Sequence, residues 1–127
     1  MNLSANISAA AQEEESMTFE EARDEVLAFR DDRDWAQFHN PKDLAISICL
    51  EASELLENFQ WSGTDLAAKD KDVQIKEELA DVLIYCIDMA NCLDVNIADI
   101  ISDKIKSDIE KYPVAKAKGN TRKYTQL

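Results

Sequence analysis

The fold is decided by EELADVLIYCIDMANCL, residues 77–93. After its first two residues, the strongly polar side chains are Asp81, Asp88 and Asn91, so a helix formed here is apolar on nearly every side. The stretch contains no glycine or proline, and it does not alternate between apolar and polar residues as a strand would. It is too short to cross a bilayer. The stretch therefore predicts a helix that other helices must cover.

Amphipathic helices are predicted on both sides of this stretch. Thr18 followed by Glu21 is a capping box, and apolar residues recur after it at helical spacing. Asn40 before Pro41 is an N-cap followed by proline at the first helical position, and Asn96 caps an isoleucine-rich helix. We therefore expect an all-α fold resembling a four-helix bundle. The helices are expected over about residues 18–34, 40–59, 72–93 and 96–112.

Length and composition set further limits. The chain has 127 residues, enough for one domain, which we expect over residues 18–127 after a flexible lead-in at residues 1–17. Two glycines and one histidine exclude a phosphate-binding loop and a two-histidine metal motif. The 26 acidic and 14 basic side chains give a net charge of −12, which disfavours nucleic acid and anionic membranes as partners.

The apolar helix predicted over residues 72–93 also bears on assembly. A four-helix monomer of this size would cover only one side of such a helix. We therefore expect a homo-oligomer, a dimer or a tetramer, with this helix at the interface. The alternative is a monomer in which the helix is central.

The cysteines and the N-terminus indicate the compartment. Cys49, Cys86 and Cys92 are odd in number, form no C-x-x-C motif and have apolar neighbours, so we expect buried, reduced thiols. The first 16 residues contain no lysine or arginine and no long apolar run, unlike a secretory signal. These features predict a cytoplasmic protein.

Two pairs of acids indicate a metal site. Glu51 and Glu54 lie three residues apart on the second predicted helix, and Glu78 and Asp81 do so on the third, so each pair shares a helical face. Glu51 falls on an apolar stripe, as do Asp81 and Asp88. Buried carboxylates must be paired or bind a cation, and neither helix has a lysine or arginine in its core. Mg²⁺ or Mn²⁺ is therefore expected, the alternative being acids on a solvated helix surface.

The basic residues are concentrated at the C-terminus. Residues 111–127 include no acid and five basic residues, namely Lys111, Lys116, Lys118, Arg122 and Lys123. Such a tail could bind a small polyanion, and the alternative is a solvated tail without a ligand.

Short motifs carry a resemblance to a known family. EASE at residues 51–54 and ELAD at 78–81 are similar to the E-x-x-E and E-x-x-D signature of the MazG-like superfamily of all-α nucleoside triphosphate pyrophosphohydrolases. The motifs RDWAQFH, FQW, EELADVLIY, KYP and RKYT, in this order, resemble the dCTP pyrophosphatase branch of that superfamily. The resemblance runs from about Thr18 to the C-terminus. One departure is Asp108, where relatives often carry asparagine.

The resemblance implies a Mg²⁺-dependent hydrolysis of a nucleoside triphosphate to the monophosphate and pyrophosphate. The implied metal ligands and catalytic residues are Glu51, Glu54, Glu78 and Asp81, with Glu51 the first candidate to orient or deprotonate the attacking water. The implied base-binding residues are Trp35, Phe38, His39, Trp61 and Tyr85, each of which taken singly could instead belong to the core. The candidates for binding the phosphates are Lys104, Lys111, Lys116 and Arg122.

Two classes of function remain open at this point. The first is a pyrophosphohydrolase that prefers dCTP or a related deoxynucleotide, with a dUTP- or dATP-directed enzyme as a sibling form. The second is a non-enzymatic, acidic helical module that binds a divalent metal or a protein partner through the helix over residues 72–93.

Overall fold

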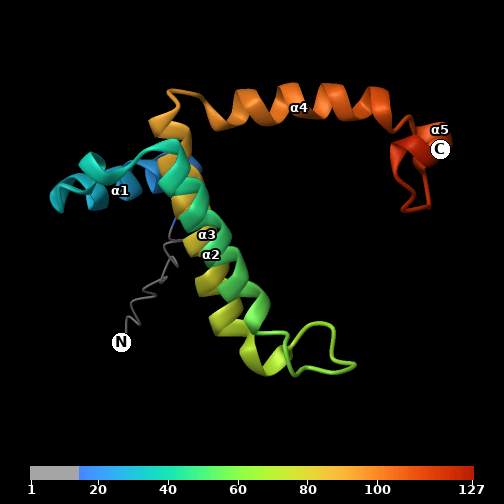
Figure 1. Ribbon diagram of the computed structural model, residues 1–127, viewed down its shortest axis with the longest axis horizontal. Helices are drawn as coiled ribbons and strands as arrows, with labels where there is room; N and C mark the ends of the chain where they lie inside the picture. The colour runs from blue at the N-terminus through green and yellow to red at the C-terminus, as the bar shows by residue number, and fades with distance from the viewer. Residues whose placement is uncertain (1–14) are drawn as a thin grey trace, which may run out of the picture.

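The computed structural model describes residues 15–127, which form five α-helices (Figure 1). No strand occurs within the described residues, so the all-α prediction is confirmed. The flexible lead-in predicted for residues 1–17 lies almost wholly outside the described residues and stays a prediction. The helices are α1 (Phe19–Asp32), α2 (Pro41–Glu57), α3 (Asp72–Cys92), α4 (Ile97–Lys111) and α5 (Val114–Ala117), with 3-10 turns at Trp35–Phe38, Lys69–Lys71 and Tyr124–Gln126.

The helix starts follow from local capping. Thr18 Oγ1 accepts a hydrogen bond from the backbone N–H of Glu21 at 3.2 Å, and Glu21 Oε2 accepts one from the N–H of Thr18 at 3.4 Å. Asn40 Oδ1 accepts from the N–H of Asp43 at 3.0 Å, and Asn96 caps α4 in the same way. Each bond satisfies a backbone donor that the first turn of a helix leaves free. The predicted starts of the first, second and fourth helices are confirmed.

α2 and α3 form a long antiparallel hairpin, which is the packed part of the molecule (Figure 1). The most buried apolar side chains of the two helices are Leu44, Ile87 and Ala90. α1 lies across the end of the hairpin where α3 finishes, and Arg30 Nη1 donates to Asn91 Oδ1 of α3 at 2.6 Å. These three helices make the framework on which the candidate site is built.

α4 and the residues after it form an arm, residues 97–127, that extends away from the hairpin (Figure 1). α4 is not among the elements that pack closely within the chain. Its apolar stripe is therefore exposed, as Ile100, Ile101, Ile105 and Ile109 show, the last at 64%. A single chain thus contains the four predicted long helices but packs only three of them together.

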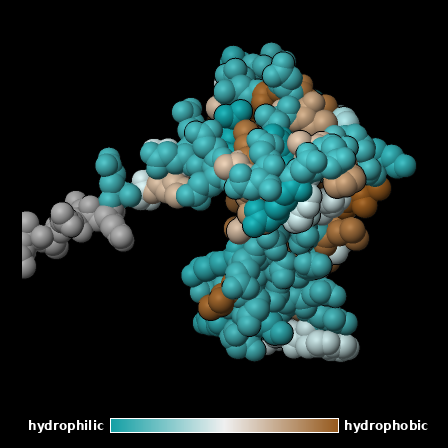
Figure 2. Space-filling model, turned by 90° about the vertical axis from the view of Figure 1, so that its left-hand side faces the viewer, coloured by the Kyte–Doolittle hydropathy of each residue, from teal (hydrophilic) through white to brown (hydrophobic). Residues whose placement is uncertain are grey.

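The hairpin exposes apolar side chains as well. Leu79 and Leu83 of α3 are about half exposed, and Figure 2 shows hydrophobic residues at the surface of a largely hydrophilic face. The oligomer interface predicted at α3 is not tested by a single chain and stays a prediction. The prediction of buried thiols is wrong for Cys49 and Cys92, which the packing of a single chain leaves exposed. No described helix is both long and apolar enough to span a membrane.

Candidate active site

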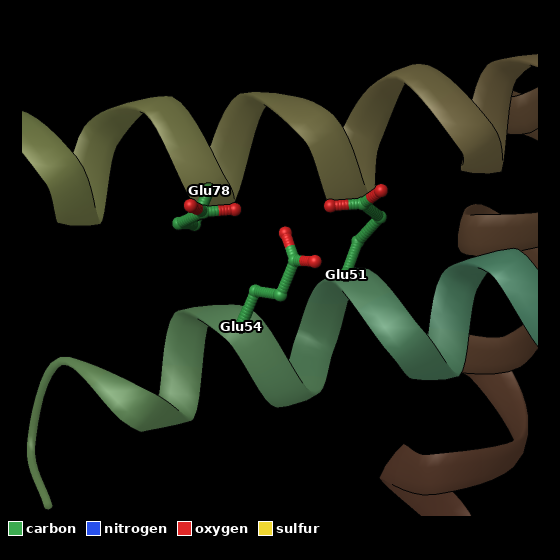
Figure 3. Close-up of side chains that lie close together, drawn as sticks. All are labelled: Glu51, Glu54 and Glu78. Atoms are coloured by element: carbon green, nitrogen blue, oxygen red, sulfur yellow. The ribbon is translucent and has the colours of Figure 1, made fainter.

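Three glutamates face one another between α2 and α3 (Figure 3). Glu51 and Glu54 lie one turn apart on α2, and Glu78 faces them from α3. One carboxylate oxygen from each residue lies within 4.8 Å of the other two. The spacing of three residues places both α2 acids on one face, and the antiparallel packing of the hairpin brings Glu78 to that face. The structure thus brings together three of the four predicted metal ligands.

Asp81, the fourth predicted ligand, lies next to this glutamate cluster. It follows Glu78 by one turn of α3 and lines a cavity beside the cluster. It is not part of the group whose oxygens lie within 4.8 Å. Its negative charge nevertheless contributes to raising the pKa of both Glu51 and Glu78, so it acts on the same site.

Burial and repulsion favour the protonated form of the cluster. Burial is the largest cause that raises the pKa of Glu51 and of Glu78 above the ordinary value of 4.5, followed by the hydrogen bond and the negative charge of Glu54. Oε2 of Glu51 and Oε2 of Glu78 are buried without a hydrogen-bond partner. The ion pairs found within residues 15–127 involve other acids, so no lysine or arginine neutralises these carboxylates.

The donor set fits a hard divalent cation. It consists of carboxylate oxygens alone, two of which lack any partner within the protein. Mg²⁺ and Mn²⁺ prefer oxygen ligands, and Mg²⁺ is usually held by a few carboxylates together with the phosphates of a substrate. Such a cation would balance the negative charge of the glutamate cluster, which no basic side chain of residues 15–127 neutralises.

A cavity of about 460 Å³ opens beside the cluster, between α1 and the hairpin. Glu51 and Asp81 form part of its wall, which joins it to the acidic cluster. Three of the five predicted base-binding residues line it, namely Trp35, His39 and Tyr85. Mostly apolar walls with a few polar groups are typical of a site for a small molecule.

Aromatic packing shapes the wall of this cavity. Phe29 meets Trp35 edge to face, with ring centroids 5.6 Å apart. The guanidinium of Arg33 lies 3.7 Å from the centroid of the Phe29 ring and stacks against it. Burial, followed by the negative charge of Glu51, raises the pKa of Tyr85, so its hydroxyl keeps its proton. The wall therefore presents aromatic faces close to the acidic cluster.

Two of the predicted base-binding residues lie elsewhere in the single chain. Phe38 is exposed and does not line the cavity. Trp61 is 89% exposed and lies in the loop that joins α2 to α3, at the opposite end of the hairpin from α1. Their role in binding a base stays a prediction.

The predicted phosphate-binding residues lie on the arm. Lys104 forms an ion pair with Asp108. Lys111 ends α4, and Lys116 and Arg122 follow it. The arm that carries them extends away from the hairpin on which the glutamate cluster lies (Figure 1). Their role in binding phosphate stays a prediction.

The cavity also includes residues that are not among the predicted metal-binding, base-binding or phosphate-binding residues. Phe29, Arg30, Ile84 and Asp88 line it. Asp88 follows Glu78, Asp81 and Tyr85 at spacings of three and four residues, which places all four on one face of α3. This spacing is the signal by which Asp88 could have been assigned to the site.

Known proteins resemble the chain in sequence and in fold. Residues 46–127 match the family model of the MazG-like family. dCTP pyrophosphatase 1 of Mus musculus and dCTP pyrophosphatase 1 of Homo sapiens are each 34% identical to the chain over 115 residues, which cover 87% of this chain and 68% of theirs. The crystal structure of a pyrophosphatase from Archaeoglobus fulgidus aligns with a TM-score of 0.69 and 36% identity, covering 77% of this chain and 94% of that one. The chain belongs to the MazG-like family.

Proposed function

We propose that the chain is a nucleoside triphosphate pyrophosphohydrolase that requires Mg²⁺ or Mn²⁺ and prefers dCTP. The observation that carries the proposal is the position of the glutamate cluster beside an aromatic-lined cavity, because a nucleotide offers a polyphosphate and a base to two such neighbouring regions. Membership of the MazG-like family and the names of the relatives, dCTP pyrophosphatase 1 and a pyrophosphatase, support the same activity.

The four acids would hold the cation. Glu51, Glu54 and Glu78 contribute the facing oxygens, and Asp81 extends the acidic surface into the cavity. When bound, the cation supplies the positive charge that lets a triphosphate approach four carboxylates. The buried oxygens of Glu51 and Glu78 that lack partners support this role.

Glu51 is the residue best placed to handle the attacking water. It belongs to the glutamate cluster and also lines the cavity, so its carboxylate lies between the region for the phosphates and the region for the nucleoside. In the proposed reaction, water attacks one of the two phosphorus atoms that the oxygen bridging the α- and β-phosphates joins. The bond between this phosphorus and the bridging oxygen breaks. The carboxylate accepts the proton that the water loses, and the products are the monophosphate and pyrophosphate.

The aromatic wall would hold the base. Trp35 is partly exposed and has its ring fixed by Phe29, so one face of the indole is available without the cost of ordering a mobile side chain. Stacking of a base on an aromatic ring contributes about 1–3 kcal/mol. Tyr85 and His39 complete this wall. The preference for dCTP is supported by the names of the relatives.

A second copy of the chain would complete the site. The arm exposes an isoleucine stripe that its own chain does not cover, and the basic residues 111–123 lie at its end, away from the acidic cluster. If this stripe packed against the exposed apolar residues of another copy, apolar surface would be removed from water. The same contact would bring the basic side chains of the arm toward the acidic hairpin of that copy. We propose that Lys104, Lys111, Lys116 and Arg122 contact the phosphates in this assembly.

The test is product analysis by phosphorus NMR. The chain is incubated with dCTP and Mg²⁺, and a parallel sample contains excess EDTA. We expect dCMP and pyrophosphate in the first sample and unchanged dCTP in the second. Orthophosphate with dCDP would show that the point of cleavage is wrong. Unchanged substrate with each of the common triphosphates, in Mg²⁺ and in Mn²⁺, would contradict the enzyme and favour the non-enzymatic metal-binding module.

A further inference from the structure

Asp88 is a buried acid with no established partner at the end of the cavity away from the glutamate cluster. The residue is 4% exposed, and its Oδ1 is buried without a hydrogen-bond partner. It also lines the cavity. A buried acceptor without a partner costs about 1–3 kcal/mol, so one that faces a cavity indicates a ligand that supplies the missing donor.

The charged neighbours of Asp88 do not satisfy this oxygen. Arg30 donates instead to Asp31 Oδ1 at 2.9 Å and to Asn91 Oδ1 at 2.6 Å. His39 has a buried Nδ1 that likewise lacks a partner, so it makes no hydrogen bond to Asp88 through this atom. Burial raises the pKa of Asp88, and the positive charges of His39 and Arg30 oppose that rise. The cavity wall therefore offers two unpartnered polar atoms, one on Asp88 and one on His39.

The geometry of α3 relates Asp88 to the acidic cluster. Asp81 and Asp88 are seven residues apart, two turns on the same face, which corresponds to about 10 Å along the helix axis. Tyr85 lies between them and also lines the cavity. This separation is of the order of the length of a nucleoside, from its α-phosphate to the far edge of a pyrimidine. A nucleotide whose phosphates lie at the glutamate cluster would bring the edge of its base to Asp88.

We propose that Asp88 is a specificity-determining residue, whose carboxylate accepts a hydrogen bond from the exocyclic amino group of the base. The inference rests on the proposed function and extends it to the choice of base. Cytosine presents an amino group at this edge, and acidic side chains accept hydrogen bonds from it in other complexes. Uracil presents a carbonyl oxygen there, which leaves two acceptors facing each other without a proton between them. Asp88 thus selects cytosine over uracil.

The experiment compares dCTP, dUTP and a dCTP analogue in which hydrogen replaces the 4-amino group. Values of kcat/KM are measured with the parent, with Asp88→Asn and with the control variant Asp24→Asn. Asp24 is a suitable control because its side chain is exposed on α1 and lies outside the cavity. The ratio of kcat/KM for dCTP to that for each other substrate is the readout, because a merely structural role of Asp88 would change all three substrates alike.

The parent should prefer dCTP over dUTP and over the analogue by a factor of about 10 to 100. In Asp88→Asn the preference over dUTP should fall toward unity, because the amide can donate to the carbonyl of uracil. The preference over the analogue should fall less, because the amide oxygen can still accept from the 4-amino group. The Asp24→Asn protein should keep the ratios of the parent. Equal use of dCTP and the analogue by the parent would overturn the proposal even if Asp88→Asn failed to fold. An unchanged ratio of dCTP to dUTP in a folded Asp88→Asn protein would overturn it as well.

The proposed function can fail separately. If the parent hydrolyses no triphosphate, the role of Asp88 is decided by binding instead. The affinities of the parent and of Asp88→Asn for dCMP and for dUMP are measured by the change in tryptophan fluorescence. Tighter binding of dCMP in the parent, lost in Asp88→Asn, would support base selection in a protein that is not an enzyme. Equal binding of the two monophosphates would overturn it.

Discussion

The hairpin of α2 and α3 and the arm of residues 97–127 are both amphipathic, yet only the hairpin fully buries some of its apolar residues within the chain. Leu44 and Ile87 are buried between the hairpin helices, whereas Ile105 and Ile109 on the arm are more than half exposed. The two regions also differ in charge. The acidic candidate metal ligands lie on the hairpin, whereas the five basic residues of segment 111–123 lie on the arm. One chain therefore builds the acidic half of the proposed site and carries the basic half away from it.

The largest expected effect is the loss of hydrolysis in a hairpin variant. Glu78→Gln removes one negative ligand from the glutamate cluster, so kcat/KM for dCTP should fall by about 10³-fold, since a bound cation contributes several kcal/mol to such a reaction. Glu77→Gln is the matched control, because Glu77 is its exposed neighbour and lies outside the cluster. Steady-state kinetics in Mg²⁺ measures both. Equal activities of the two variants would mean that the cluster is not the metal site.

A second effect tests the arm. The double variant Ile101→Glu, Ile105→Glu places two charges on the exposed apolar stripe, where burial of each isoleucine against another copy would contribute about 1.5–3 kcal/mol. Light scattering should give an oligomer for the parent and the mass of one chain, 14.3 kDa, for the variant. Lys106→Glu on the polar face should leave the assembly intact. A parent that already has the mass of one chain would contradict the proposed oligomer.

A smaller effect separates the two tryptophans. Trp35→Ala should weaken the binding of a slowly hydrolysed dCTP analogue by about 1–3 kcal/mol, because the indole lines the cavity. Trp61→Ala should have a comparable effect only if a second copy covers that exposed ring. Isothermal titration in the parent and in the monomeric arm variant distinguishes these cases. Unchanged affinity in Trp35→Ala would place the base outside this cavity.

The smallest effect is the pH dependence of stability without metal. The pKa values of Glu51 and Glu78 are raised in the folded chain above the ordinary 4.5, so the folded form holds protons that the unfolded form releases. This stabilisation is complete below about pH 4.5 and is lost as the pH rises through the folded pKa values. Thermal melts in EDTA should therefore show Tm falling above that pH, and Mg²⁺ should restore it. In Glu51→Gln the fall should be shallower, and an identical fall would contradict this origin.

The helices and the glutamate cluster could be predicted because their causes are local. Thr18 and Asn40 accept hydrogen bonds from the N–H groups three residues later, and the capping pattern is visible in the sequence. Glu51 and Glu54 share a face through helical spacing alone. Only the approach of Glu78 to these two residues requires tertiary packing. The apolar stripes of the two helices predict that packing, because each stripe must be covered by another helix.

The cavity could not be predicted in the same way, because it depends on where α1 crosses the hairpin. The bond between Arg30 and Asn91 that fixes this crossing joins residues 61 positions apart. Asp88 was recognised as an acid on an apolar stripe, but its lack of a partner depends on what Arg30 and His39 contact instead. The pattern of α4 predicts a helix with one apolar face, and this pattern is the same whether its own chain or another covers that face.

The hairpin connection has a consequence for how fast the protein becomes active. α2 and α3 follow each other in the chain through the segment 58–71, and contacts between residues close in sequence dominate the described residues because most of them are helical. Helical units of this kind refold in microseconds to milliseconds. Docking of the arm onto another copy would be a bimolecular step, whose rate depends on concentration. Newly made chains would therefore be folded before they are active, and the delay between the two states would depend on how many copies the cell holds.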